Sequence, residues 1–228
     1  MLKELLAIFR KDSMLDDAFR QSYEMLDITK QMFLEARTTL RKTDTVQLHT
    51  SVYELDKKVN KYQREVRKEV LQYLSVAGVE RLASGLNLIN IIIDLERIGD
   101  YTKNIVEMAE NHQAKLDAGN REEDLIRIET ALEEAFNRLR FVLENSDEEA
   151  AKAMIKDYIW INPLCDKHVR GFIQEEDESL SRRSTVVLAL YFRYLKRIHS
   201  HLRNIATTVY RPFHKTGFIP KKAKDQTE

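Results

Sequence analysis

The sequence is poor in the residues that break helices. Only 6 of its 228 residues are glycine and 3 are proline, whereas Leu, Glu, Lys, Ala, Arg and Ile are plentiful. This composition favours long helices over sheets joined by tight turns, so we predict an all-α protein. A chain of this length buries roughly 70% of the surface that its unfolded form exposes, which supplies a hydrophobic core without cross-links.

The sequence also has a single cysteine, no net charge and no long apolar run. The single cysteine, Cys165, excludes an intramolecular disulfide and a zinc site made of several cysteines, as is typical of a protein in a reducing cytoplasm. The 37 basic residues balance the 37 acidic ones, so no overall field favours nucleic acid or anionic lipid. No uncharged apolar stretch reaches the roughly 20 residues that cross a bilayer. We therefore expect a cytoplasmic protein that binds no nucleic acid and contacts membranes only through a partner or a surface patch.

Several enzyme signatures are missing. The sequence has no phosphate-binding loop, no dinucleotide fingerprint and no serine nucleophile elbow. None of the six histidines follows a glutamate by three residues, which removes the Glu-x-x-His pair of di-iron bundles. Cys165 has no evident histidine base, so we expect it to be a small core or boundary residue. We expect a protein that is not an enzyme.

Breaks in the helical pattern divide the chain into four parts. We predict a short N-terminal helix over residues 1–12 and a first three-helix repeat over 13–118. Ala-Gly-Asn at 118–120 marks the midpoint, and a second three-helix repeat follows over 119–211. Residues 212–228 form a basic tail, which we interpret as frayed, with a docking segment as the alternative. Pro163 predicts a kink or break inside the fifth helix.

The third and sixth helices match at an offset of 100 residues. Segment 94–105 (DLERIGDYTKNI) aligns with segment 194–205 (YLKRIHSHLRNI), and the apolar positions agree along both helices. Shared apolar residues are expected of any two amphipathic helices. The polar pair Arg97 and Asn104 also recurs, at Arg197 and Asn204. We interpret these pairs as contacts between helices, with plain solvated positions as the competing interpretation.

Two acidic residues of the third helix lie one turn apart. Glu96 and Asp100 project from one helix face, where like charges repel by roughly 0.2–0.5 kcal/mol unless a cation compensates them. Carboxylate oxygens suit hard cations such as Mg, Ca or Mn, and iron. The competing interpretation is a charge ladder that Lys103 and Glu107 continue on the same face. Gly99, inside a strong helix, suggests the close approach of another backbone.

The segment DLERIGDYTKNI resembles the signature of the PhoU family, and the similarity extends to the helix lengths and the two-repeat organisation. The resemblance implies two three-helix bundles and a repressor of the phosphate-starvation response. Its expected partners are a membrane sensor histidine kinase and the ATPase of the phosphate transporter. Some members bind iron, zinc or other metals through Glu/Asp-x-x-x-Asp motifs.

Residue by residue, the resemblance places a metal motif on Glu96 and Asp100, with Asp56 as a further candidate from the facing helix. The second repeat departs from this pattern, because Lys196 and Ser200 stand at the equivalent positions. A divalent or iron-type metal ion is therefore expected at the first repeat only.

We predict an adaptor that regulates phosphate uptake and phosphate-responsive signalling by protein contact. The alternatives are a metal-binding helical bundle and a generic helical interaction module. A homodimer is left open.

Overall fold

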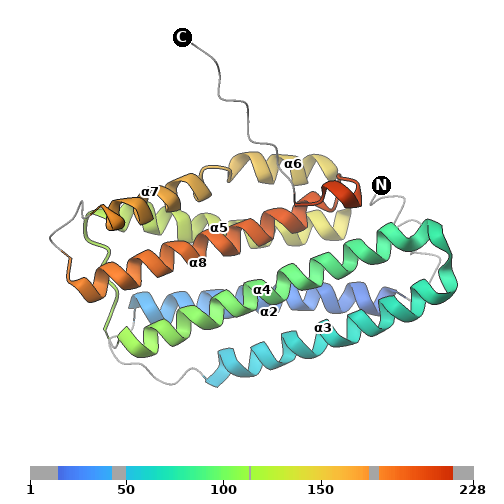
Figure 1. Cartoon of the computed structure of the whole chain (residues 1–228), viewed down its shortest axis with the longest axis horizontal. Coiled ribbons are helices and arrows are strands. Elements are labelled where there is room, and N and C mark those ends of the chain that lie inside the picture. The colour runs from blue at the N-terminus through green and yellow to red at the C-terminus, as the bar shows by residue number, and fades with distance from the viewer. Residues whose placement is uncertain (1–14, 43–49, 113, 175–179, 218–228) are drawn as a thin grey trace, which may run out of the picture.

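A computed structural model describes residues 15–42, 50–112, 114–174 and 180–217. These residues are mostly helical and contain no strand, which confirms the all-α prediction (Figure 1). The predicted N-terminal helix at 1–12 lies outside the described residues. The α-helices are α2 (Asp16–Lys42), α3 (Thr50–Ala77), α4 (Leu82–His112), α5 (Glu122–Asn145), α6 (Glu148–Asp157), α7 (Ile161–Ile173) and α8 (Arg182–Thr207), with short 3-10 turns η1 (Val79–Arg81), η2 (Gly119–Arg121) and η3 (Phe213–Lys215).

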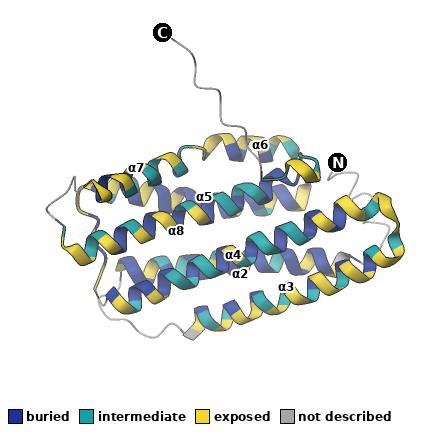
Figure 2. Cartoon of the chain, in the orientation of Figure 1, coloured by how far each residue is buried: buried dark blue, intermediate teal, exposed yellow. Residues whose placement is uncertain are grey.

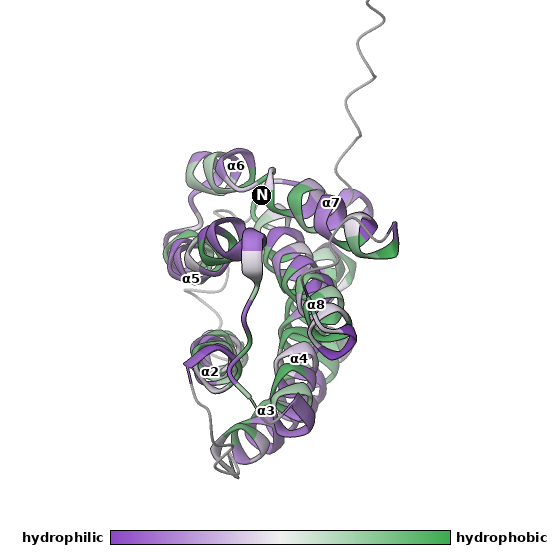
Figure 3. Ribbon diagram, turned by 90° about the vertical axis from the view of Figure 1, so that its left-hand side faces the viewer, coloured by the Kyte–Doolittle hydropathy of each residue, from purple (hydrophilic) through white to green (hydrophobic). Residues whose placement is uncertain are grey.

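The helices pack in two groups. Helices α2, α3 and α4 contact one another, and α8 packs against α5, α6 and α7. The end-on view in Figure 3 shows these groups one above the other. Apolar residues at spacings of three and four give each helix a buried stripe, visible as dark blue in Figure 2. The grouping supports the predicted pair of bundles, whose bounds stay a prediction.

Helices α4 and α8 run antiparallel and join the two groups. His201 Nδ1 on α8 lies 2.6 Å from Asp94 Oδ1 on α4. The rings of Tyr101 and Tyr194 lie 6.0 Å apart between centroids. At an offset of 100, Asp94 corresponds to position 194 and Tyr101 to position 201, so these two contacts are reciprocal. Reciprocal contacts are expected when two copies of one unit pack about a twofold axis, which supports the predicted repeat.

The break predicted near Pro163 is present, but it lies before the proline. Helix α6 ends at Asp157 and α7 begins at Ile161, so Pro163 is the third residue of α7. The first-turn N–H groups of a helix have no intrahelical partner, and proline therefore costs little there. The structure thus has two helices where the sequence predicted one helix with a kink or a local break.

A buried network of charged side chains connects α2 to the second group of helices, α5–α8. Arg41 donates to Glu122, to Glu129 Oε1 at 3.2 Å and to the Leu116 carbonyl at 2.6 Å. The Tyr191 hydroxyl donates to Glu129 Oε1 at 2.7 Å. Arg41 and Glu129 are 7% and 6% exposed, and each has the partners that a buried charge requires.

Residues 213–217 are not a frayed tail. They turn back after α8 and pack on the structure, with the Gly217 N–H donating to Thr207 Oγ1 at 2.7 Å. The Thr216 hydroxyl lies 3.5 Å from Asn87 Oδ1 on α4. The rest of the predicted tail, 218–228, lies outside the described residues.

We expect His199 to make the fold sensitive to acid. Burial, followed by the charge of Arg203, lowers the pKa of His199 to about 3, and its Nδ1 lies 2.8 Å from Asn162 Oδ1. A lowered histidine pKa gives stability that is complete above the unfolded value of about 6.5 and is lost as pH falls below it, by up to about 1.4 kcal/mol per pH unit.

Urea unfolding at pH 7.5 and pH 5.0 measures this loss. His199→Gln should lose less stability between the two values than the unmodified protein does, whereas His214→Gln, on the exposed turn η3, should behave like the unmodified protein. Equal losses in all three proteins would contradict the assignment.

Candidate functional site

The structure brings the three predicted metal ligands together on α3 and α4. Asp56 lies on α3, and Glu96 and Asp100 lie one turn apart on the facing side of α4. The charges of Asp100 and Asp56 both act on the Glu96 carboxyl. Asp56 is 9% exposed, so this acidic cluster (Asp56, Glu96 and Asp100) lies partly below the protein surface.

Two basic side chains of α4 neutralise part of the cluster's charge. Lys103 Nζ lies 3.3 Å from Asp56 Oδ2 and 3.5 Å from Asp100 Oδ1, so one ammonium bridges two helices. Arg97 Nη1 lies 3.1 Å from Asp100 Oδ2, and Arg97 Nε lies 3.7 Å from Glu96 Oε2. Lys103 thus occupies the position that a bridging cation would take.

The charged form of the Glu96 carboxyl is disfavoured in the folded protein. Burial, and then the charge of Asp100, raise its pKa above the usual range, against the opposing effect of Arg97. A raised carboxyl pKa means that the charged form is disfavoured in the folded state, so this group weakens the fold as pH rises through its folded pKa. The three carboxylates face two basic side chains, so one negative charge of the cluster is not balanced by these ion pairs.

The cluster does not form an open metal centre. Across the described ranges, no three or more His, Cys, Asp or Glu side chains are arranged to hold a metal ion. A metal at Asp56 and Asp100 would have to displace the Lys103 ammonium. Metal binding by Asp56, Glu96 and Asp100 stays a prediction.

The equivalent face of α8 forms an ion pair with the neighbouring helix α7. Lys196 Nζ lies 2.5 and 2.6 Å from the two carboxylate oxygens of Asp166 on α7. The Ser200 hydroxyl donates to the Lys196 carbonyl at 2.9 Å and accepts from Asn162 Nδ2 at 3.0 Å. In each half, a lysine of the long central helix is paired with an aspartate of a neighbouring helix.

Two sequence interpretations need correction. Arg97 contacts acidic side chains of its own helix and is 55% exposed, so the solvated interpretation holds for it. Gly99 marks no close backbone, because a methyl group there would meet only side chains, at 3.8–3.9 Å.

Cys165 is buried as expected, and burial raises its pKa to about 12, so its thiol stays protonated.

Comparison with known proteins assigns the family. Residues 23–109 match the family model of the PhoU domain. The chain is 30% identical over 189 residues to the phosphate-specific transport system accessory protein PhoU homolog of Pseudomonas putida, covering 77% of this chain and 69% of that protein. The chain belongs to the PhoU family.

The fold agrees with this assignment. The crystal structure of PhoU from Pseudomonas aeruginosa superposes on the PhoU-family chain with a TM-score of 0.77 and 18% identity, covering 87% of this chain and 96% of that one. Within the described part of the chain, no helix is long and apolar enough to cross a membrane. The matched domain, 23–109, contains the whole acidic cluster.

Lys103 is the residue whose role the sequence did not reveal. The charge ladder on α4 placed it near Asp100 but not near Asp56, since Asp56 is 47 residues away along the chain. The signal was a lysine three residues after Asp100, on the helix face that meets α3. Contacts between helices decide which acid such a lysine pairs with.

We expect Lys103→Met to destabilise this PhoU-family protein by about 1–2 kcal/mol at neutral pH, because it removes the cation that pairs with the mostly buried carboxylate of Asp56. Lys57→Met removes only the exposed pair with Glu54 and should cost less than about 0.5 kcal/mol. Added Mn²⁺ should raise the melting temperature of Lys103→Met more than that of the unmodified protein, because the freed carboxylates favour a hard cation.

Thermal melts with and without Mn²⁺, together with elemental analysis of the purified proteins, measure both effects. An unaltered melting temperature in Lys103→Met would refute the bridging role. A metal response that survives Glu96→Gln with Asp100→Asn would place the metal elsewhere.

Proposed function

We propose that this chain regulates inorganic phosphate uptake and phosphate-responsive signalling by protein contact. Its partner would be the ATPase of a membrane phosphate transporter or a sensor histidine kinase. The observation that carries the proposal is the 30% identity to a protein named as an accessory of a phosphate-specific transport system. We place the protein in the cytoplasm, where both partners would present their soluble domains.

The α3–α4 turn offers a surface for such a contact. Leu71, Val76 and Val79 are 72%, 71% and 80% exposed at this end of the hairpin. Large apolar side chains in water are costly, and exposed groups of them commonly mark protein-binding surfaces. Gly78 has φ 82°, a left-handed conformation that shapes the turn and suits glycine. We name Leu71, Val76 and Val79 the apolar tip.

A regulator of this kind should co-purify with its partner. Tagged protein, expressed in its own cells and isolated from detergent-solubilised membranes, should retain the transporter ATPase or the sensor kinase, as identified by mass spectrometry. Val76→Asp with Val79→Asp should reduce this retention at least tenfold, because a charge at the tip opposes burial against a partner. Ile159→Asp, at a residue 50% exposed in the second group of helices, is the matched control.

The outcomes separate the candidate functions. If the protein retains neither the transporter ATPase nor the sensor kinase, the proposed regulatory function is wrong. Retention that the tip variants leave unchanged would move the contact to another surface. Stoichiometric metal in a protein with no partner would favour the metal-binding bundle, and partners unrelated to phosphate would favour the generic interaction module.

A further inference from the structure

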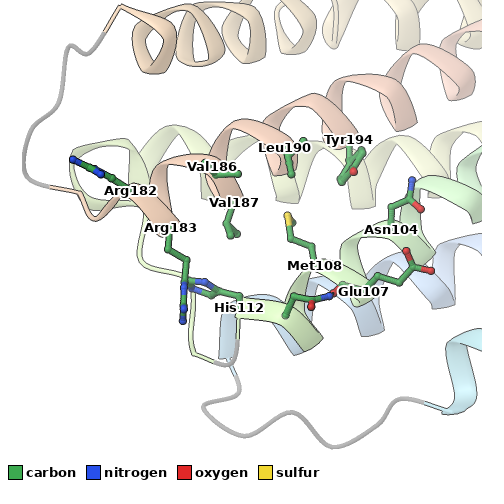
Figure 4. Close-up of a pocket in the computed structure, with 11 residues that line it drawn as sticks. Asn104, Glu107, Met108, His112, Arg182, Arg183, Val186, Val187, Leu190 and Tyr194 are labelled. Carbon is green, nitrogen blue, oxygen red and sulfur yellow. The ribbon is translucent and has the colours of Figure 1, made fainter.

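An open groove lies between the C-terminal half of α4 and the N-terminal half of α8. Its volume is about 710 Å³. Figure 4 shows side chains of both helices facing it, with Met108 and His112 from α4 opposite Val187 and Leu190 from α8. Val186 and Leu190 are 59% and 41% exposed. The groove therefore presents apolar surface to solvent along the junction of the two helix groups.

The reciprocal packing of α4 and α8 gives this groove a counterpart at the other end of the junction. At the offset of 100, lining residues Asn104 and Glu107 correspond to Asn204 and Thr207, and Val187 corresponds to position 87.

The chain itself covers part of this counterpart set of positions. The Gly217 N–H donates to Thr207 Oγ1, Gly217 packs on the Asn204 side chain, and Thr216 Oγ1 lies 3.5 Å from Asn87 Oδ1. A short segment, residues 213–217, thus packs on part of the equivalent set of positions. Leu82 and Leu86, the equivalents of Arg182 and Val186, remain 43% and 37% exposed.

One end of the open groove is basic. Arg182 and Arg183 occupy the first turn of α8, which contains no acidic residue, and among the described residues neither arginine forms an ion pair. His112 is 6% exposed, and its Nδ1 has no hydrogen-bond partner in the described structure. The first-turn N–H groups of a helix add partial positive charge at this end.

The opposite end of the groove carries hydrogen-bonding groups of another kind. Asn104 and Glu107 line it. Side-chain amides both donate and accept, so they suit a peptide backbone. The carboxylate of Glu107 disfavours a second acid at this end, which gives a bound segment a preferred direction.

We propose that this groove binds a short acidic peptide segment of a partner protein, much as residues 213–217 pack on Asn87, Asn204 and Thr207 at the other end of the junction. The acid of the segment would pair with Arg182 and Arg183, and an apolar side chain would cover Val186 and Leu190. The inference rests on the proposed function only for the identity of the protein that supplies the segment.

Other occupants match these features less well. A small anion would pair with the arginines but leave the apolar floor uncovered. The chain's own C-terminal residues include Lys221, Lys222 and Lys224, whose charge the arginines repel. An acidic peptide with an apolar anchor satisfies both ends of the groove.

A labelled peptide tests the proposal directly. The probe Pro-Phe-Glu-Glu-Thr-Gly-Phe copies residues 212–218 with acids in place of His214 and Lys215. We expect saturable binding by fluorescence anisotropy, and at least tenfold weaker binding for the peptide with the original His-Lys pair. Arg182→Glu with Arg183→Glu should weaken binding of the acidic probe at least tenfold, and Val186→Asp should also weaken it. Arg193→Glu, an exposed position of α8 outside the groove, should change it less than twofold.

Each remaining outcome overturns the proposal. These outcomes are no saturable binding, equal binding of both peptides, or no effect of the arginine variant when circular dichroism shows intact folding. Competition by inorganic phosphate at matched ionic strength would identify a small-anion site instead, and self-association abolished by the arginine variant would identify a second copy as the occupant.

The peptide result and the co-purification result are independent. If the unmodified protein retains its partner but binds no peptide, the proposed groove function is wrong and the regulatory function stands. If it binds the peptide but retains no phosphate-transport component, the groove function stands and the regulatory function is wrong.

Discussion

The antiparallel packing of α4 against α8 is the constraint on which the rest of the structure depends. The reciprocal contacts of Asp94 with His201 and of Tyr101 with Tyr194 fix the register of the two helices. Because side chains repeat every 3.6 residues, a slip by one residue would rotate both apolar stripes out of the core. This one junction therefore positions the two helix groups, the acidic cluster on the flank of α4 and the groove along its C-terminal half.

The acidic cluster and the ion pair on α8 show how two similar helices solve the same electrostatic problem differently. On α4, Lys103 bridges Asp56 and Asp100, and a surplus carboxylate, Glu96, remains. On α8, Lys196 stands at the position of Glu96 and pairs with Asp166, so no surplus acid remains. The two helices pack reciprocally, whereas the charge left over in these ion pairs differs: acids outnumber cations by one on α4 and balance them on α8.

Much of the fold was predictable because helix periodicity and scarce glycine and proline act locally. The end of α4 at His112, the turn at Gly78 and the start of α8 after Ser181 all follow from residues near the break. The failures have non-local causes. Lys103 reaches Asp56 only because α3 packs beside α4, and residues 213–217 are ordered by Asn87 and Thr207 on two different helices. A sequence pattern does not report such contacts.

Pseudosymmetry explains why the open groove was invisible in the sequence yet clear in the structure. Arg182, Val186 and Leu190 alone describe an ordinary amphipathic helix face, with nothing to separate a solvated face from a binding face. The distinction comes from the other end of the junction, where residues 213–217 pack on Asn87, Asn204 and Thr207. Fixing each residue of the segment after α8 costs about 1–2 kcal/mol of conformational entropy. Its packing against α4 and α8 must therefore be favourable enough to offset that cost. The ordered segment at one end therefore indicates what the geometry of the other end accommodates.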